Sequence, residues 1–309
     1  MTRILEPGQI EALGELAVPR IRLPERSGPF AARARRLRQL AAPGAIGHAI
    51  GDYLILVAAV VDAQEATFAT LDPRLPDAAE LARARTHRMP PIEAHSWPRE
   101  PAWRALAAQL TERVAAAADI PDSARAELSQ VRSLPPEWLE AQADALLSGR
   151  REEIEMAAAP FVMAALQTWW VALASRLTEE VVPALEVPGV CPACGTLPVT
   201  SIVRVDNDKR SQGYRYLHCA LCATEWHLLR ATCSHCLSTE GIAQNSIEGG
   251  PEAIRAESCE RCHTYRKILF QEKDVSVEPV ADDLASLALD VLMGEAGYHR
   301  GSSNPLLWQ

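Results

Sequence analysis

Eight cysteines, all arranged as Cys-x-x-Cys pairs, constrain this chain more than any other feature. The first 190 residues contain no cysteine, and none of the eight is left outside a pair. Two residues between thiols let both sulfurs turn toward one point, and a second pair completes a tetrahedron around a metal ion. The sequence therefore predicts two mononuclear metal sites, each with four cysteine ligands. The pairs are Cys191/Cys194, Cys219/Cys222, Cys233/Cys236 and Cys259/Cys262.

An internal repeat predicts how these pairs combine. When residues 214–224 are aligned with residues 254–264, an arginine, both cysteines and a threonine coincide. The gap inside each site is also similar, with 24 residues between Cys194 and Cys219 and 22 between Cys236 and Cys259. A duplicated unit should close its own site, which favours the first pair with the second and the third with the fourth. An interleaved arrangement is the alternative.

Disulfides, redox motifs and iron–sulfur clusters are the other uses of such pairs. The start of the chain has no apolar run typical of a signal peptide, which predicts the reducing cytoplasm, where structural disulfides are rare. A thioredoxin-type role needs one Cys-x-x-Cys at a helix start rather than four pairs. Iron–sulfur clusters also use cysteine ligands, but the even division into two fours favours mononuclear sites. The spacing does not decide between zinc and iron.

Charge and hydropathy restrict the possible partners. The formal net charge is −9, which argues against a general nucleic-acid binder. Residues 187–275 contain ten Lys or Arg and ten Asp or Glu, and four thiolates with a divalent ion add a further −2 per site. The longest apolar stretch, residues 53–61, is about half of the ~20 residues that a membrane span requires. We therefore expect no nucleic-acid partner and no membrane insertion.

Composition divides the chain into a helical part and a metal-binding part, which predicts a multidomain α+β fold. The first part is rich in alanine, leucine and arginine, which favour helices. The second is expected to hold two tandem four-cysteine units resembling zinc ribbons, followed by a C-terminal helix. The expected domains are residues 1–182 (helical), 187–230 and 231–278 (the two ribbons) and 279–309 (C-terminal helix and tail).

Local signals predict the elements inside these domains. Proline and glycine at helix ends, with apolar residues at helical spacing, indicate helices at residues 30–41, 45–70, 77–86, 101–118, 123–132, 136–148 and 151–182, the last kinked at Pro160. Strands are expected at residues 197–205, 213–218, 224–230, 253–257 and 264–271, with a turn at residues 206–208. In the C-terminal helix we expect Leu284, Leu287 and Val291 to form one apolar stripe, with Asp282 or Asp283 as the cap.

The sequence contains no pattern typical of an enzyme active site. It has no Gly-rich phosphate loop, no Gly-x-Ser-x-Gly and no His-Glu-x-x-His. His218, His235 and His263 neighbour the cysteines, but four sulfurs already fill a tetrahedron, so we expect them outside the coordination sphere. Glu225 and Trp226 follow Cys222 and either pack within a strand or, with His218, contact a partner protein.

Four segments resemble the FdhE family, accessory proteins for the maturation of formate dehydrogenase. One is Tyr-Arg-Tyr-Leu-His-Cys-Ala-Leu-Cys-Ala-Thr-Glu-Trp-His at residues 214–227. The others are Cys-Pro-Ala-Cys-Gly at 191–195, Cys-Glu-Arg-Cys-His-Thr-Tyr-Arg-Lys at 259–267 and Glu-Pro-Val-Ala-Asp-Asp-Leu-Ala-Ser-Leu-Ala-Leu-Asp at 278–290. The similarity covers much of the C-terminal third and includes all four cysteine pairs.

This resemblance implies more than the cysteine spacing does. It implies a cytoplasmic, non-catalytic protein that contacts the catalytic subunit of respiratory formate dehydrogenase before export. It also implies rubredoxin-like sites associated with iron, which makes iron the favoured metal and leaves zinc possible. A rubredoxin-like electron carrier or redox enzyme is the alternative function.

Overall fold

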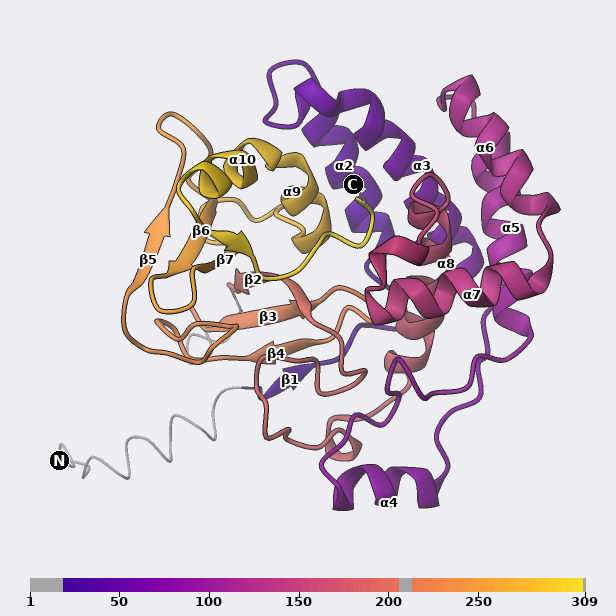
Figure 1. The fold of residues 1–309 in the computed structure, drawn as a ribbon, viewed down its shortest axis with the longest axis horizontal. Helices are drawn as coiled ribbons and strands as arrows, with labels where there is room; N and C mark the ends of the chain where they lie inside the picture. Colours follow the sequence, from indigo (N-terminus) through magenta and orange to yellow (C-terminus); the bar gives the residue numbers. More distant parts are fainter. Residues whose placement is uncertain (1–18, 206–212, 308–309) are drawn as a thin grey trace, which may run out of the picture.

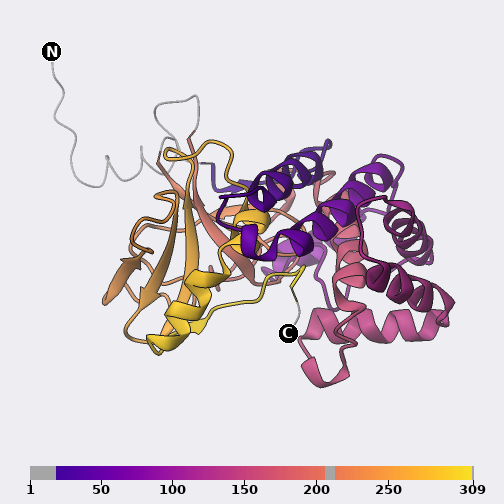
Figure 2. The same cartoon turned by 90° about the horizontal axis from the view of Figure 1, so that it is seen from above.

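A computed structural model describes residues 19–205 and 213–307 of the chain. Helices gather on one side of the molecule and a β-sheet on the other, as Figures 1 and 2 show. Two C-terminal helices lie over the sheet and reach back toward the first helices of the chain. The predicted α+β architecture, with a helical part followed by a sheet that carries both cysteine groups, is confirmed.

The helices occupy most of the ranges that local signals predict, and two match them fully. The helices are α2 (Phe30–Ala41), α3 (Gly51–Phe68), α4 (Ala78–Thr86), α5 (Ala102–Ala116), α6 (Asp122–Ser133), α7 (Pro136–Ser148), α8 (Ala159–Ala174), α9 (Pro279–Ala285) and α10 (Leu287–Glu295). Short 3₁₀ turns occur at η1 (His48–Ile50), η2 (Arg151–Glu153) and η3 (Glu179–Val181). In the described part of the chain, every helix is too short or too polar to cross a membrane.

Proline and glycine set the ends of α7 in the way the sequence predicts. Pro136 is the first residue of the helix, where its missing N–H would have had no intrahelical partner. Gly149 ends the helix in the left-handed region, with a φ of 66° that side chains with a Cβ rarely adopt. Asp77 begins α4 with a capping box that it forms with Glu80.

The expected long helix over residues 151–182 is wrong. The helix in this region, α8, begins at Ala159, and Pro160 lies in its first turn. Proline has no N–H to donate and its ring clashes with a preceding helical turn, so Pro160 lies at the start of the helix rather than at a kink inside it. Nearly all of α8 is buried, which makes it the central helix of the helical part.

One mixed sheet contains the strands of both expected ribbons. The strands are β1 (Ile21–Arg22), β2 (Pro198–Val203), β3 (Arg215–Cys219), β4 (Glu225–His227), β5 (Ile242–Asn245), β6 (Ile254–Cys259), β7 (Thr264–Phe270) and β8 (His299–Arg300). Their order is β1-β4-β3-β2-β7-β6-β5, and β8 pairs with β7. The ribbons are joined by the parallel pairing of β2 with β7, while β1 attaches the N-terminal part by antiparallel pairing with β4. The sequence did not predict β1, β5 or β8, and the turn expected at residues 206–208 lies outside the described residues.

The single C-terminal helix expected from the sequence is two helices, α9 and α10, separated at Ser286. Glu278, rather than an aspartate, caps α9 by accepting hydrogen bonds from two backbone N–H groups of its first turn. Asp282 and Asp283 are buried and form ion pairs with arginines. Val291, expected in the apolar stripe, is 60% exposed because the break at Ser286 changes the face that α10 turns inward.

The apolar core does not divide at residues 183–186, the linker between the helical part and the first ribbon. The Trp169 and Trp170 side chains of α8 belong to one buried cluster with Leu217, Leu221 and Trp226 of the first ribbon. A second buried cluster joins α2, α3 and α9 with residues of the same ribbon. The helical part and the first ribbon therefore share a hydrophobic core.

Candidate metal centres

The first four cysteines meet between two loops of the first ribbon. One loop follows the linker and carries Cys191 and Cys194, and the other, between β3 and β4, begins with Cys219 and carries Cys222. The Cys191 and Cys222 sulfurs are 3.6 Å apart, and the Cys194 and Cys219 sulfurs are 3.4 Å apart. A tetrahedral ion with metal–sulfur bonds of about 2.3 Å places its sulfurs about 3.8 Å apart. The donor set and its spacing therefore fit a metal ion.

The second four cysteines form an equivalent group. The sulfurs of Cys233 and Cys262 are 3.7 Å apart, as are those of Cys236 and Cys259. In each group all four sulfurs lie within 4.8 Å of one another. The structure thus brings the pairs together in sequential fours, as the repeat predicts, and not in the interleaved arrangement.

The four cysteine loops share one backbone conformation. In each loop, the residue that follows the second cysteine has a positive φ, which turns the chain so that both sulfurs face the same point. Only the first loop has glycine there, and the other three place a side chain in a region that favours glycine. The residues are Gly195 (79°), Ala223 (58°), Leu237 (62°) and His263 (52°).

Hydroxyl groups lie beside the sulfurs of the first group. Thr196 Oγ1 is 3.2 Å from the Cys194 sulfur and 3.1 Å from the Cys219 sulfur, and Thr224 Oγ1 is 3.1 Å from the Cys222 sulfur. The Cys222 thiol donates to Thr224, whereas the Thr196 hydroxyl can donate to a thiolate and stabilise its charge. Thr264, the counterpart of Thr224, donates to the Cys262 carbonyl, and its side chain also hydrogen-bonds the Cys262 thiol and helps to lower its pKa. We did not predict this role for either threonine of the first group, although Thr224 is the threonine conserved between the repeats.

The two groups differ in burial. All four cysteines of the first group are at most 1% exposed, whereas Cys236 of the second is exposed and Cys262 is half-buried. Burial raises the pKa of the Cys191 and Cys194 thiols well above the usual value. Four buried thiolates need a cation beside them, and metal binding supplies it as the thiols release their protons.

Three family models describe nearly the whole length of this chain. The FdhE N-terminal model matches residues 18–186, the FdhE central domain matches 190–230, and the FdhE C-terminal domain matches 231–307. The chain belongs to the FdhE family. Both cysteine groups lie within the matched regions, the first in the central domain and the second in the C-terminal domain.

Individual FdhE proteins are similar over the same length. A protein FdhE homolog of Cronobacter sakazakii is 37% identical over 310 residues, which is 99% of this chain and 97% of the relative. A homolog from Pectobacterium atrosepticum is 40% identical over 286 residues, covering 90% and 87% of the two chains. The crystal structure of the FdhE protein from Pseudomonas aeruginosa matches with a TM-score of 0.82 and 39% identity, over 94% of this chain and 99% of that one.

The three non-cysteine residues considered for partner contact are all buried in this FdhE-family chain. His218, Glu225 and Trp226 are each 4% exposed. Trp226 donates its ring N–H to the Pro188 carbonyl at 2.7 Å, so the structure supports the packing interpretation rather than an exposed anchor. The Nδ1 atom of His218 lies 3.0 Å from Glu225 Oε1, and Arg204 pairs with the same carboxylate. Burial alone would raise the pKa of Glu225, but Arg204 and His218 hold it well below its usual range.

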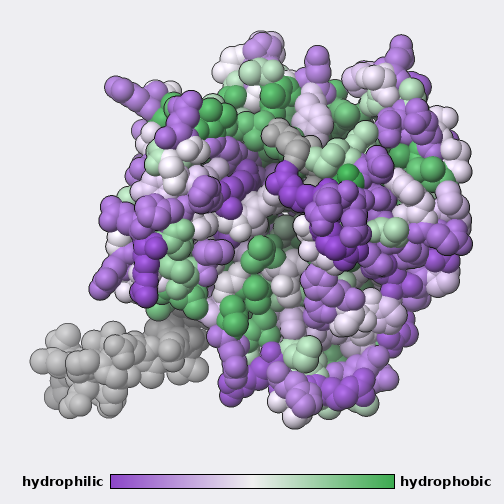
Figure 3. Space-filling view, in the orientation of Figure 1, coloured by the Kyte–Doolittle hydropathy of each residue, from purple (hydrophilic) through white to green (hydrophobic). Residues whose placement is uncertain are grey.

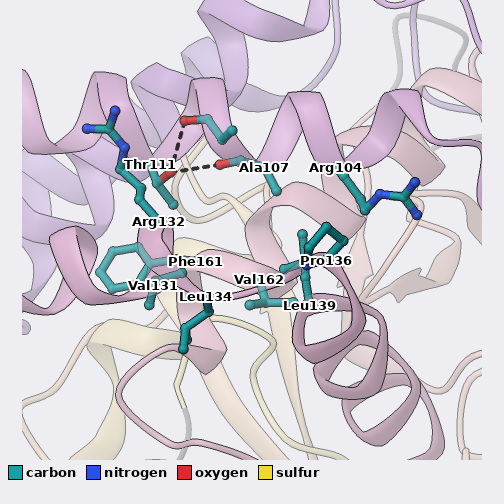
Figure 4. Close-up of a pocket in the computed structure, with 11 residues that line it drawn as sticks. Arg104, Ala107, Thr111, Val131, Arg132, Leu134, Pro136, Leu139, Phe161 and Val162 are labelled. Atoms are coloured by element: carbon teal, nitrogen blue, oxygen red, sulfur yellow. Dashed lines mark hydrogen bonds between the residues drawn. The ribbon is translucent and has the colours of Figure 1, made fainter.

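A cavity of about 170 Å³ lies among α5, α6, α7 and α8, away from both cysteine groups (Figure 4). The Thr111 hydroxyl in its wall donates to the Ala107 and Ala108 carbonyls, 2.9 Å away in both cases. Arg104 pairs with Glu140, which is not part of the wall. None of the described residues that line the cavity is a Cys, His, Asp or Glu. We interpret it as a packing gap, which leaves the cysteine groups as the chemically distinctive sites.

Proposed function

We propose that this chain is a non-catalytic accessory protein for the maturation of respiratory formate dehydrogenase. In this proposal it binds the catalytic subunit of the enzyme in the cytoplasm, before that subunit is exported. Membership of the FdhE family over nearly the whole chain is the observation that carries the proposal. The helical unit (residues 1–182), the two ribbons (187–230 and 231–278) and the C-terminal unit (279–309) are the proposed functional divisions.

The eight cysteines would hold two metal ions in this function, with iron favoured and zinc possible. A bound zinc would act as a cross-link, whereas an iron held by four sulfurs could also change its oxidation state. The residues of the chain itself fix the geometry: the cysteine loops aim the sulfurs, and the Thr196 hydroxyl can stabilise the charge of the first group. Each group thereby links strands that are too few to hold a separate core.

The surface is compatible with contact to another protein. It is mostly hydrophilic on the face in Figure 3, where hydrophobic side chains gather in a hollow near the centre. A cleft of about 430 Å³ also lies beside the first cysteine group, between the end of α7 and the C-terminal tail. Leu197, in the wall of this cleft, is 46% exposed. Apolar surface left open in this way is typical of places where proteins meet.

Gene deletion with complementation tests the proposal. The deletion strain should lose respiratory formate oxidation while still synthesising the dehydrogenase polypeptide, because the chain would act after translation. Complementation with the intact gene should restore activity, and Cys219→Ser or Cys259→Ser should not. Normal formate oxidation in the deletion strain would contradict the proposal.

An electron carrier is the second candidate, and the exposure of the second cysteine group favours it. Electron transfer needs close approach of a redox partner, and Cys236 is exposed at the surface. Absorbance of the anaerobically purified protein separates the two functions. A ferric thiolate band that a reductase cycles rapidly would support the carrier, while a protein without such a band would support the accessory role alone.

A further inference from the structure

The helical part covers the first cysteine group. Ile92 and Ala94, in the segment between α4 and α5, donate their backbone N–H groups to the carbonyls of Ala193 and Cys194, at 3.1 and 2.9 Å. This places a segment of the helical part against the loop that joins Cys191 to Cys194. Ile92 and Ala94 are fully buried, as are Cys191, Ala193 and Cys194. The helical part therefore contributes to the burial of the Cys191 and Cys194 side chains.

The corresponding loop of the second group is fixed at one end and open at the other. Next to Cys233, the Ser234 hydroxyl accepts a hydrogen bond from the buried Arg266 side chain at 2.8 Å. At the other end Cys236 is exposed, and its neighbour Leu237 is 38% exposed. The four ligands of this group therefore do not share one environment, because Cys233 lies on the protected side and Cys236 on the side that faces solvent.

This difference sets how each group can exchange ligands. Replacing one thiolate by another on a metal ion requires the incoming sulfur to approach the ion from outside. The first group has no exposed member, and Thr196 and Thr224 add hydrogen bonds that hold its sulfurs in place. In the second group, Cys236 already lies exposed at the surface, where an incoming sulfur can approach.

We propose that Cys236 is an exchangeable ligand and that the second group accepts a thiol from another molecule in its place. The incoming thiol gives up its proton and its sulfur takes the coordination position that Cys236 leaves. The proton passes to the Cys236 sulfur, so one sulfur–metal bond forms, one breaks, and no electrons are transferred. This inference rests on the proposed metal binding and goes beyond the accessory role, because it gives the second group a chemical class of external ligand.

Thiol labelling of the metal-loaded full chain is the first test. Elemental analysis should give two metal equivalents per chain before labelling. Iodoacetamide should then modify Cys236 several-fold faster than Cys194, its buried counterpart in the first group, as peptide mass spectrometry can measure. A protein without metal would contradict the proposed metal sites themselves. Two equivalents with equal labelling of both cysteines would overturn only the inference about Cys236.

Rescue by an external thiol is the second test, with Cys236→Ala and Cys194→Ala as matched variants. Each is loaded with cobalt, whose visible absorption reports four-sulfur coordination, and 2-mercaptoethanol is added. The absorption per chain should return to the wild-type value in Cys236→Ala only, because the vacant position there is open to solvent. Failure of the thiol to restore Cys236→Ala, or equal restoration of both variants, would overturn the proposal. If Cys194→Ala does not fold, the labelling of the wild-type chain still decides.

Discussion

The two cysteine groups have the same ligands and nearly the same geometry, but they lie in different surroundings. The first is enclosed by an apolar core that includes α8, so its metal would hold the helical part and the ribbon together. The second is attached through an apolar cluster that includes residues of α10, and through charged side chains. Lys267 of β7 lies 2.6 Å from Asp290 of α10, and Arg300 of β8 pairs with Asp283 of α9. Duplication of one unit has thus produced one enclosed site and one accessible site.

A single pair of equivalent positions illustrates the divergence. Trp226 follows the second cysteine pair of the first ribbon at the same distance as Arg266 in the second. Trp226 packs into the shared apolar core, whereas Arg266 is buried among polar groups and bonds Ser234 and the Pro198 carbonyl. Burial, with the charge of Arg300 nearby, lowers the pKa of Arg266 to about 10. At this position the first ribbon is therefore held by apolar packing and the second by hydrogen bonds.

The largest expected effect comes from Cys219→Ser, compared with its counterpart Cys259→Ser. Structural zinc is worth about 10–16 kcal/mol in small peptides, which is comparable with the ~5–15 kcal/mol that stabilises a whole domain. Because the first group shares its core with the helices, Cys219→Ser should unfold the helical part as well as the ribbon. Limited proteolysis checks this. A protease-resistant helical fragment in Cys219→Ser would show that the two parts fold separately, while Cys259→Ser should retain that fragment.

Trp226→Ala should produce the next largest loss. Removing a buried tryptophan side chain costs about 3–5 kcal/mol in the free energy of unfolding. Urea unfolding followed by far-ultraviolet circular dichroism should show the helices becoming less stable along with the ribbon. Trp226→Phe is the control, since it keeps most of the packing and loses the hydrogen bond to Pro188, worth about 1 kcal/mol. Equal stability of Trp226→Ala and the wild type would contradict the shared core.

Asp283→Asn should weaken the attachment of the second ribbon by about 2 kcal/mol, because it removes a buried carboxylate that pairs with Lys267 and Arg300. Asp290 remains as the second carboxylate that both cations share. Burial alone would raise the pKa of Asp283, but Arg300 and Lys267 hold it below its usual value. A carboxyl group whose pKa is lower in the folded chain stabilises the fold at any pH above its pKa in the unfolded chain, which is about 3.9 for Asp. This stabilisation is lost as the pH falls through the pKa of the folded chain. The difference in unfolding free energy between wild type and Asp283→Asn should therefore be full at pH 7 and shrink below about pH 4. A difference that does not change with pH would contradict the ionic attachment.

The smallest expected effect comes from the residue with positive φ that follows the second cysteine in equivalent loops of the two groups. Leu237 has a φ of 62°, and glycine stands at the same place in the first group. Leu237→Gly should relieve backbone strain and change the free energy of unfolding by about 1 kcal/mol or less in the stabilising direction. Gly195→Ala should destabilise by a similar or larger amount, because its φ is 79°. Thermal unfolding of both variants tests the pair, and a Leu237→Gly variant clearly less stable than the wild type would show that the leucine side chain is needed for packing.

The sequence predicted the features that nearby residues determine, such as the ends of helices and the grouping of the cysteines. Pro136 and Gly149 mark the ends of α7, and the repeat around Cys219 and Cys259 predicts the sequential grouping of the cysteines. Pro160 was misread, because proline in a first turn and proline at a kink leave the same pattern in a sequence.

The features that the sequence did not predict depend on contacts between residues far apart in the chain. The parallel pairing of β2 with β7 joins segments whose sequences carry no mark of each other. The cover over the first group comes from Ile92 and Ala94, about a hundred residues before the cysteines they protect. Trp226 is buried because it packs in one apolar cluster with Ile92, Ala94 and residues of α8. No local pattern distinguishes the enclosed cysteine group from the accessible one.

Hydrogen–deuterium exchange during stepwise metal removal is the most direct test of the difference between the two groups. A chelator added to the fully loaded chain should first release one equivalent, and the amides of residues 233–271 should lose protection at that stage. Release of the second equivalent should then expose residues 191–230 together with α5 and α8, since they share a core. Both ribbons opening together, or α5 and α8 remaining protected after all metal has left, would contradict this account.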